Sequence, residues 1–174
     1  MTLRNHLLIA LLAAVLCVLS PWAIPIGSVP ITLATLGVYL AAGLLGSKGG
    51  AAAVALYLAM GLVGVPVFSG FAGGLAPLTG ITGGYLWGYL PCAALAGWLA
   101  RRKDTLLPLG FAVGTVALYT VGTAWFMWQT HTPVGAALLT CVLPFLPADG
   151  AKIALATVLT RSLLPHLHQK ERHN

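Results

Sequence analysis

The sequence has very little charge. Charged side chains make up 7% of its 174 residues, and only three of them are acidic, whereas 59% of the residues are hydrophobic. A soluble domain carries roughly 25% charged residues, because its surface must face water. A chain of this composition cannot cover a water-facing surface, which predicts an integral membrane protein.

The chain also lacks the residue patterns of redox, metal and nucleotide chemistry. Its three cysteines are widely spaced within apolar runs and have no CxxC or zinc-ligand spacing. It contains no GxxxxGK[ST] phosphate loop, no HExxH pair and no Ser/His/Asp arrangement in a recognisable context. We therefore expect no metal, no cofactor and no catalytic residue. The net charge of +6 does not indicate nucleic acid, because the basic residues form no stripe with interleaved aromatics.

Long apolar runs predict six membrane-spanning helices, since a membrane helix needs about 20 mostly apolar residues. The runs cover residues 3–20, 30–46, 51–65, 81–100, 106–128 and 134–164, and the last is broken between Pro144 and Pro147. Pro30 is expected in the first turn of the second helix, where proline is tolerated. The prediction is an all-α membrane protein with one domain over 1–164 and a polar cytoplasmic tail over 165–174. Residues 66–80 are expected to form an uncharged, glycine-rich loop.

The basic residues are distributed unevenly among the segments that connect the apolar runs. Eight of the nine Lys and Arg lie at the N-terminus, after the second and fourth runs, or near and beyond the end of the sixth. None lies in the opposite connections, 21–29, 66–80 and 129–133. Because cytoplasmic segments are enriched in Lys and Arg, both termini are predicted to be cytoplasmic. The ninth basic residue is Lys152, inside the broken sixth run.

Asp149 and Lys152 are the strongest candidates for a site. A charged side chain at membrane depth costs at least ~2.5–3.5 kcal/mol, so it is read first as functional. Residues three apart share a helix face, and a helix N-terminus favours a carboxylate. The pair is therefore predicted to line a small-molecule pocket near the outer face, beside residues 66–80. The alternative is an ion pair that only stabilises the broken segment.

Two other stretches are candidates for contacts. Thr82-Gly83-Gly84-Tyr85 begins the fourth run, where glycines permit close approach of a ligand and Tyr85 supplies a flat apolar body with a hydroxyl. Helix packing explains the same glycines equally well. Ala10 and Ala14, with Ala13 beside them, form a small-residue patch on the first helix, which predicts close packing against another helix inside or outside the chain.

Four motifs in order resemble one family. They are Val29-Pro30-Ile31-Thr32-Leu33, Gly64-Val65-Pro66-Val67-Phe68, Thr82-Gly83-Gly84-Tyr85-Leu86 and Pro144-Phe145-Leu146-Pro147-Ala148-Asp149-Gly150-Ala151-Lys152. Together they resemble BioY, the biotin-specific substrate-binding (S) component of energy-coupling-factor (ECF) transporters. The resemblance covers nearly the whole chain. It implies a six-helix protein of the bacterial inner (plasma) membrane that binds biotin with high affinity from the outside, together with a transmembrane T component and ABC-type ATPases.

The resemblance also implies roles for individual residues. Asp149 and Lys152 match residues that bond the ureido ring and head group of biotin, and Tyr85 with its glycines matches the fourth-helix part of the pocket. Ala10 and Ala14 match the contact with the T component. Independently of the resemblance, Phe68 and Phe71 of residues 66–80 would add aromatic surface to a site for such a ligand. The alternatives are a transporter for another small vitamin, an intramembrane enzyme that uses Asp149, and a purely structural subunit.

Overall fold

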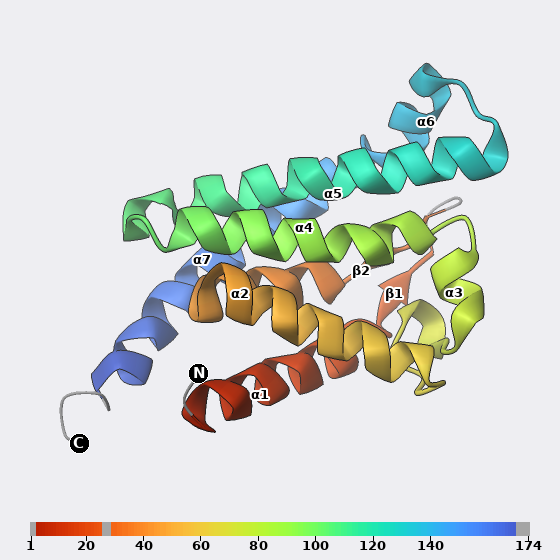
Figure 1. Cartoon of the computed structure of the whole chain (residues 1–174). Helices are drawn as coiled ribbons and strands as arrows, with labels where there is room; N and C mark the ends of the chain where they lie inside the picture. The colour runs from red at the N-terminus through yellow and green to blue at the C-terminus, as the bar shows by residue number, and fades with distance from the viewer. Residues whose placement is uncertain (1–2, 26–28, 170–174) are drawn as a thin grey trace.

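Apolar helices make up most of the structure, a computed structural model that describes residues 3–25 and 29–169. The long elements are α1 (Leu3–Leu19), α2 (Ala34–Leu62), α4 (Gly83–Ala100), α5 (Leu107–Thr130), α6 (Val134–Cys141) and α7 (Leu146–Gln169). The short elements are β1 (Ala23–Ile24), β2 (Ile31–Thr32), α3 (Leu75–Thr79) and the 3-10 turns Ser69–Phe71 and Asp104–Leu106. α2 lies between α1 and α4, α5 covers the far side of α4, and α7 crosses behind them (Figure 1).

α2 is two helices that fold back on each other at Gly46. In a straight helix, residues 37 and 57 would lie about 30 Å apart at 1.5 Å per residue. Both instead meet the end of α1: the backbone of Gly37 packs on Leu16, and the hydroxyls of Ser20 and Tyr57 are hydrogen bonded. Gly46 has φ 73° and ψ −170°, a conformation that suits glycine. The predicted division into two helices, over 30–46 and 51–65, is confirmed, with the turn at Gly46 rather than at residues 48–50 between the two runs.

Glycines allow the helices to approach closely. A Cβ at Gly97 of α4 would lie 2.4 Å from the backbone carbonyl carbon of Gly46, and one at Gly84 would lie 2.2 Å from Cβ of Trp125 in α5. Small residues at such crossings let helix backbones pack together inside a membrane, where apolar surface alone gives little driving force. These contacts hold α4 between α2 and α5, and the arrangement fixes which side chains face the interior.

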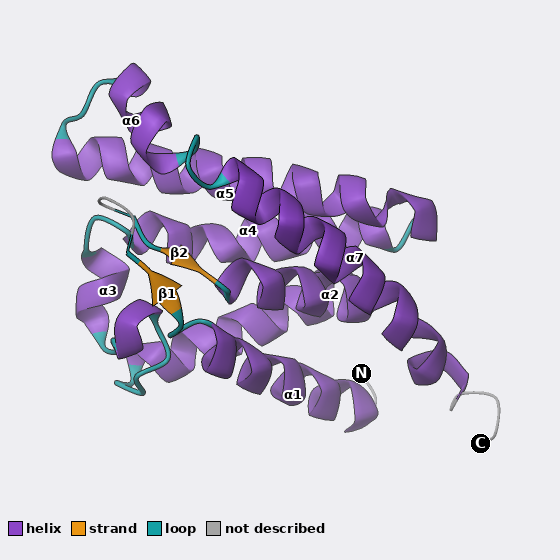
Figure 2. Ribbon diagram, turned by 180° about the vertical axis from the view of Figure 1, so that it is seen from behind, coloured by secondary structure: helices purple, strands orange, loops and turns teal. Residues whose placement is uncertain are grey.

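The two ends of the bundle differ in their connections. Both termini lie at the same end as the connection between α4 and α5, while the β1–β2 ribbon, α3 and α6 lie at the other end (Figures 1 and 2). The basic residues of the connections therefore gather at the end that holds the termini, as the charge count predicts. The cytoplasmic location of that end and the number of six crossings stay predictions.

Membrane-spanning capacity is present in the described part of the chain. By length and composition alone, α5 could cross a bilayer, and so could α2 if its two parts are counted as one helix. α6 and α7 could cross together as a pair bent by 48°. The predicted broken last span is thus confirmed. Its break covers residues 142–145, and Pro147 lies in the first turn of α7, where the missing N–H has no helical partner to lose.

Three boundary predictions were wrong. Pro30 is not in a helix: residues 31–32 pair with 23–24 as an antiparallel ribbon, and the second helix begins at Ala34, whose N–H donates to Thr32 Oγ1 at 3.3 Å. Residues 66–80 hold a 3-10 turn and α3 rather than loop alone. α7 continues through Pro165 to Gln169, because a single proline removes only one helical hydrogen bond near a helix end. Residues 170–174 of the predicted tail lie outside the described residues.

Candidate ligand-binding site

A buried ion pair lies at the start of α7. The Nζ atom of Lys152 is 2.8 Å from Oδ1 of Asp149, and the two residues are 8% and 4% exposed. Asp149 is in the first turn of the helix, where the backbone dipoles favour a negative charge. The spacing of three residues places both side chains on one helix face. The sequence therefore folds locally into a helix start that presents an acid and a base to the interior.

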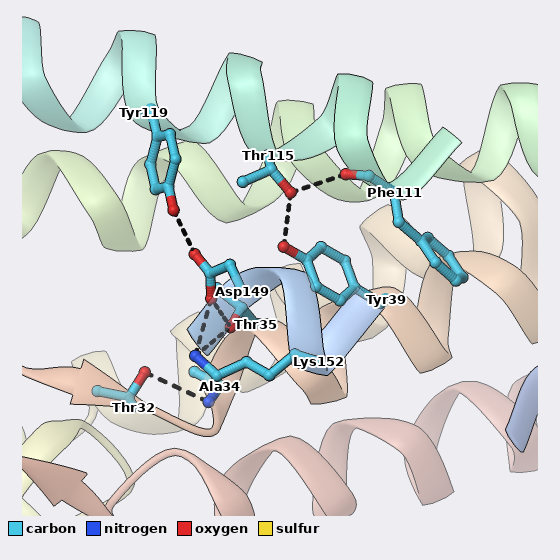
Figure 3. A network of polar contacts seen from close by, with 9 residues as sticks. All are labelled: Thr32, Ala34, Thr35, Tyr39, Phe111, Thr115, Tyr119, Asp149 and Lys152. Carbon is cyan, nitrogen blue, oxygen red and sulfur yellow. Dashed lines mark hydrogen bonds and ion pairs between the residues drawn. The ribbon is translucent and has the colours of Figure 1, made fainter. Parts of the chain in front are cut away.

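Two hydroxyl groups from other helices complete the environment of this pair. Thr35, in the first turn of the second helix, donates to Asp149 Oδ1 at 3.2 Å and accepts from Lys152 Nζ at 3.0 Å. Tyr119 of α5 donates to Asp149 Oδ2 at 2.6 Å (Figure 3). The site thus joins α2, α5 and α7, and both carboxylate oxygens accept hydrogen bonds. Buried charges persist in proteins when they are paired in this way.

A second polar contact between α2 and α5 lies one helical turn from the residues that bond the ion pair. The hydroxyls of Tyr39 and Thr115 are 2.6 Å apart, and Thr115 donates to the carbonyl of Phe111 at 2.8 Å (Figure 3). The ring of Tyr39 stacks on that of Phe111, with 5.2 Å between the ring centroids. Because Tyr39 follows Thr35 by one helical turn and Thr115 precedes Tyr119 by one turn, this contact fixes α2 against α5 next to the ion pair.

A cavity of about 280 Å³ opens beside the ion pair. This volume is just below the range of roughly 300–1,000 Å³ that is usual for ligand pockets, so the cavity suits a small molecule rather than a large one. Its walls are mainly apolar and aromatic, with hydroxyls and the ion pair as the polar groups. The lining residues are Val29, Pro30, Thr32, Thr35, Phe68, Ser69, Ala72, Pro77, Thr82, Tyr85, Leu86, Tyr89, Leu118, Tyr119, Phe145, Asp149 and Lys152.

Five of the residues predicted for the site line this cavity: Asp149, Lys152, Thr82, Tyr85 and Phe68. They come from three separate parts of the chain, so the fold brings together residues that are far apart in the sequence. The hydroxyl of Tyr85 donates to the carbonyl oxygen of residue 141 at 3.1 Å, which links the start of α4 to the end of α6.

Three predicted residues do not line the cavity. The backbone of Gly84 packs on Trp125, and a Cβ at Gly83 would lie 2.2 Å from the carbonyl oxygen of Leu78. These two glycines therefore hold α4 against α5 and α3. Phe71 is 59% exposed and contacts Trp22 edge to face, with 5.8 Å between the ring centroids.

Thr35, Tyr119 and Tyr89 line the cavity although the sequence did not single them out. Thr35 lies two residues after the motif of residues 29–33, which was the available signal. Tyr119 lies in the apolar run that forms α5, and a single tyrosine in such a run is only a weak signal of a binding site. Only the folded arrangement shows that the hydroxyl of Tyr119 reaches the carboxylate of Asp149.

The small residues of α1 divide between two faces. Ala13 is 2% exposed and packs inside the bundle, whereas Ala10 and Ala14 are exposed. Large apolar side chains share the exposed face of the helix, namely Leu3, Leu7, Leu11 and Val18. This face is available to lipid or to another membrane helix.

Comparison with known proteins gives consistent matches over nearly the whole chain. The sequence model of the BioY family matches residues 1–169. The biotin transporter BioY2 of Lactococcus lactis subsp. cremoris is 38% identical over 169 residues, which cover 95% of this chain and 93% of that protein. The biotin transporter BioY of Thermotoga maritima is 37% identical over 152 residues, 85% of this chain and 89% of that protein.

A solved structure has the same fold. It is a crystal structure of the S-component for biotin from an ECF-type ABC transporter, and it superposes with a TM-score of 0.86 at 31% identity, covering 94% of each chain. This match confirms the predicted fold class, a helical membrane bundle of the S-component type with a broken last span.

Proposed function

The chain belongs to the BioY family, and from this premise we propose that it is the biotin-binding S component of an ECF transporter. It captures biotin with high affinity at the outer face of the bacterial inner membrane and delivers it inward. Because the matched relatives are named as transporters, the prediction that the chain is not an enzyme is confirmed.

The observation that carries the proposal is the buried pair of Asp149 and Lys152 at the wall of a small apolar cavity. Biotin has two N–H groups and a carbonyl on one ring, an apolar sulfur ring and a carboxylate. A carboxylate accepts N–H bonds and an ammonium donates to a carbonyl. Asp149 and Lys152 thus supply a partner for each kind of group on the ureido ring.

The other site residues act on the apolar part of the ligand or on the geometry of the pocket. Tyr85 and Phe68 supply aromatic surface, and Thr82 supplies a hydroxyl. Gly83 and Gly84 contribute by holding α4 in place, since each packs on a neighbouring segment without room for a side chain. Phe71 belongs to the outer surface near this end of the bundle and stays a prediction as a contact.

The distribution of charge supports the proposed direction of capture. The lining residues before α2, after α2 and between α6 and α7 lie at the end of the bundle away from both termini (Figure 1). The Lys and Arg of the connections lie at the opposite end, which the positive-inside rule assigns to the cytoplasm. Both observations support a cavity that faces the outer side.

Partners are proposed from the exposed face of α1. Ala10 and Ala14 lie on that face among large apolar side chains. Small residues let a second membrane helix approach closely. We assign this face to the transmembrane T component, which couples the chain to ABC-type ATPases, and the rest of the apolar exterior to the lipid bilayer.

Native mass spectrometry of the freshly purified protein tests the function directly. The expected result is a 1:1 complex with biotin that survives from the cells or forms on addition of biotin, and that other vitamins do not displace. A protein that takes up a different vitamin, and no biotin, would contradict the proposal.

A further inference from the structure

The hydrogen-bonding capacity of the ion pair is nearly filled by the protein itself. An ionised carboxylate accepts at about four lone-pair positions, and an ammonium donates three N–H bonds. Oδ1 of Asp149 accepts from Lys152 Nζ and from Thr35 Oγ1, while Oδ2 accepts from the hydroxyl of Tyr119. Lys152 donates to Asp149 and to Thr35.

After these bonds are counted, one hydrogen-bond acceptor position and one donor of the ion pair remain. Within the part of the chain that the structure describes, one lone pair on Asp149 Oδ2 and one N–H of Lys152 are left for a ligand. The two charged groups are 2.8 Å apart and both line the cavity. The remaining acceptor is on Oδ2, the oxygen bonded by Tyr119, and the remaining donor is on Nζ, which bonds the other oxygen, Oδ1; both groups belong to residues that line the cavity (Figure 3).

We infer that Thr35 and Tyr119 are positioning residues, and that they limit the Asp149–Lys152 pair to one acceptor beside one donor. This inference rests on the proposed function, because it assigns how the same site selects its ligand. The chemical class it selects is a neutral ring edge with an N–H next to a C=O, as in a cyclic urea. The N–H donates to Asp149 and the C=O accepts from Lys152.

The same arrangement rejects edges of other kinds. A guanidinium edge presents two donors, so that one N–H opposes the remaining N–H of Lys152 in a buried site. A carboxylate edge presents two acceptors, so that one oxygen opposes Oδ2 of Asp149. Buried polar groups left without a partner carry their full desolvation cost, which is how a site of this type discriminates between ligands of similar shape.

Thr35 and Tyr119 suit this role because each belongs to a helix other than α7, which fixes its hydroxyl independently of the ion pair. Thr35 is buried in α2 and bridges the acid and the base, which fixes both heads in one geometry. Tyr119 is buried in α5 and occupies one position on Oδ2. Neither residue needs to touch the ligand ring to decide which edge it can present.

Tyr119→Phe tests the count at Oδ2. Affinities for biotin and for 2-iminobiotin, whose ring is a guanidinium at neutral pH, are measured for the wild type and the variant by calorimetry. Removal of the hydroxyl frees a second acceptor for the guanidinium. The preference for biotin is therefore expected to fall roughly tenfold, the size of one charge-assisted hydrogen bond. Thr120→Val is the control, since its hydroxyl only bonds the carbonyl of Val116 in its own helix, at 2.8 Å.

Thr35 supplies a second, independent test. Thr35→Val keeps the shape of the side chain and removes the hydroxyl, whereas Thr35→Ser keeps the hydroxyl and removes a methyl group. A positioning role predicts that biotin affinity falls roughly tenfold or more in the valine variant and stays within about threefold of the wild type in the serine variant. A packing role predicts the opposite order.

The outcomes distinguish failure of the positioning role from failure of the proposed function. An unchanged preference in Tyr119→Phe, or a valine variant of Thr35 that binds as well as the serine variant, overturns the positioning role while wild-type biotin binding leaves the function intact. A wild type that binds no biotin overturns the proposed function itself. Equal losses for both ligands in Tyr119→Phe indicate a merely structural residue and also overturn the inference.

Discussion

Removing Lys152 alone should destabilise the protein far more than removing the whole ion pair. Lys152→Met leaves the carboxylate of Asp149 at 4% exposure without the ammonium that lies 2.8 Å away. Breaking a buried ion pair by removal of one partner costs about 3–5 kcal/mol, because the remaining charge is buried and uncompensated. For a chain of this size, 1 kcal/mol shifts Tm by about 2–4 °C, so the expected decrease is about 6–20 °C.

The double variant Asp149→Leu with Lys152→Met removes both charges and leaves side chains of similar volume. Replacing a buried pair by apolar residues is often neutral or stabilising by about 1–4 kcal/mol. We therefore expect its Tm to return to the wild-type value or above, while biotin binding stays absent. Thermal unfolding by intrinsic fluorescence, in one detergent and with and without biotin, measures both quantities.

Two results would show that the ion pair does not have this role. A Tm of Lys152→Met within about 1 °C of the wild type would mean that the pair is not buried as described. A double variant that recovers its stability and also binds biotin normally would mean that the pair serves only to stabilise α7, which is the structural alternative to a binding site.

Three further predictions concern positions outside the ion pair. Gly46→Ala should lower Tm, because the φ of 73° at this position suits glycine and an added Cβ would lie 2.3 Å from an arginine side chain. The control is Gly150→Ala, which has open space around it and should leave Tm unchanged or raise it. Gly84→Leu should lower Tm and weaken biotin binding together, because it forces α4 away from α5, and a variant with normal stability would contradict that packing. Ala10→Trp with Ala14→Trp should keep biotin binding in the purified protein and abolish energised uptake in cells, and unchanged uptake would remove the T component from this face of α1.

The helices and the ion pair were predictable from the sequence for physical reasons. Apolar runs of membrane length have few other structures available, since every backbone polar group must be satisfied within a helix. Asp149 and Lys152 stood out because charge at membrane depth is costly. The reversal at Gly46 was also indicated by nearby glycines, although its position was missed by two residues.

The partners of the ion pair were not predictable, because hydroxyl side chains in helices usually bond their own backbone. Thr120 and Thr157 each donate to the carbonyl four residues earlier, as membrane-helix threonines commonly do. Nothing local distinguishes them from Thr35, whose hydroxyl instead bridges two residues of α7 that are more than a hundred positions away. The β1–β2 ribbon was missed for a related reason: two-residue strands form because the ends of two helices bring them together.

Asp149, in the first turn of α7, is proposed to bind biotin in the cavity. The decisive experiment is a calorimetric titration of biotin into the purified wild type, Asp149→Asn and the control Thr120→Val. We expect saturation at one biotin per chain for the wild type and the control, and a loss of affinity of at least about a hundredfold for Asp149→Asn, which removes the charge from a buried hydrogen-bonded pair. An Asp149→Asn variant that folds and binds biotin as tightly as the wild type would contradict it.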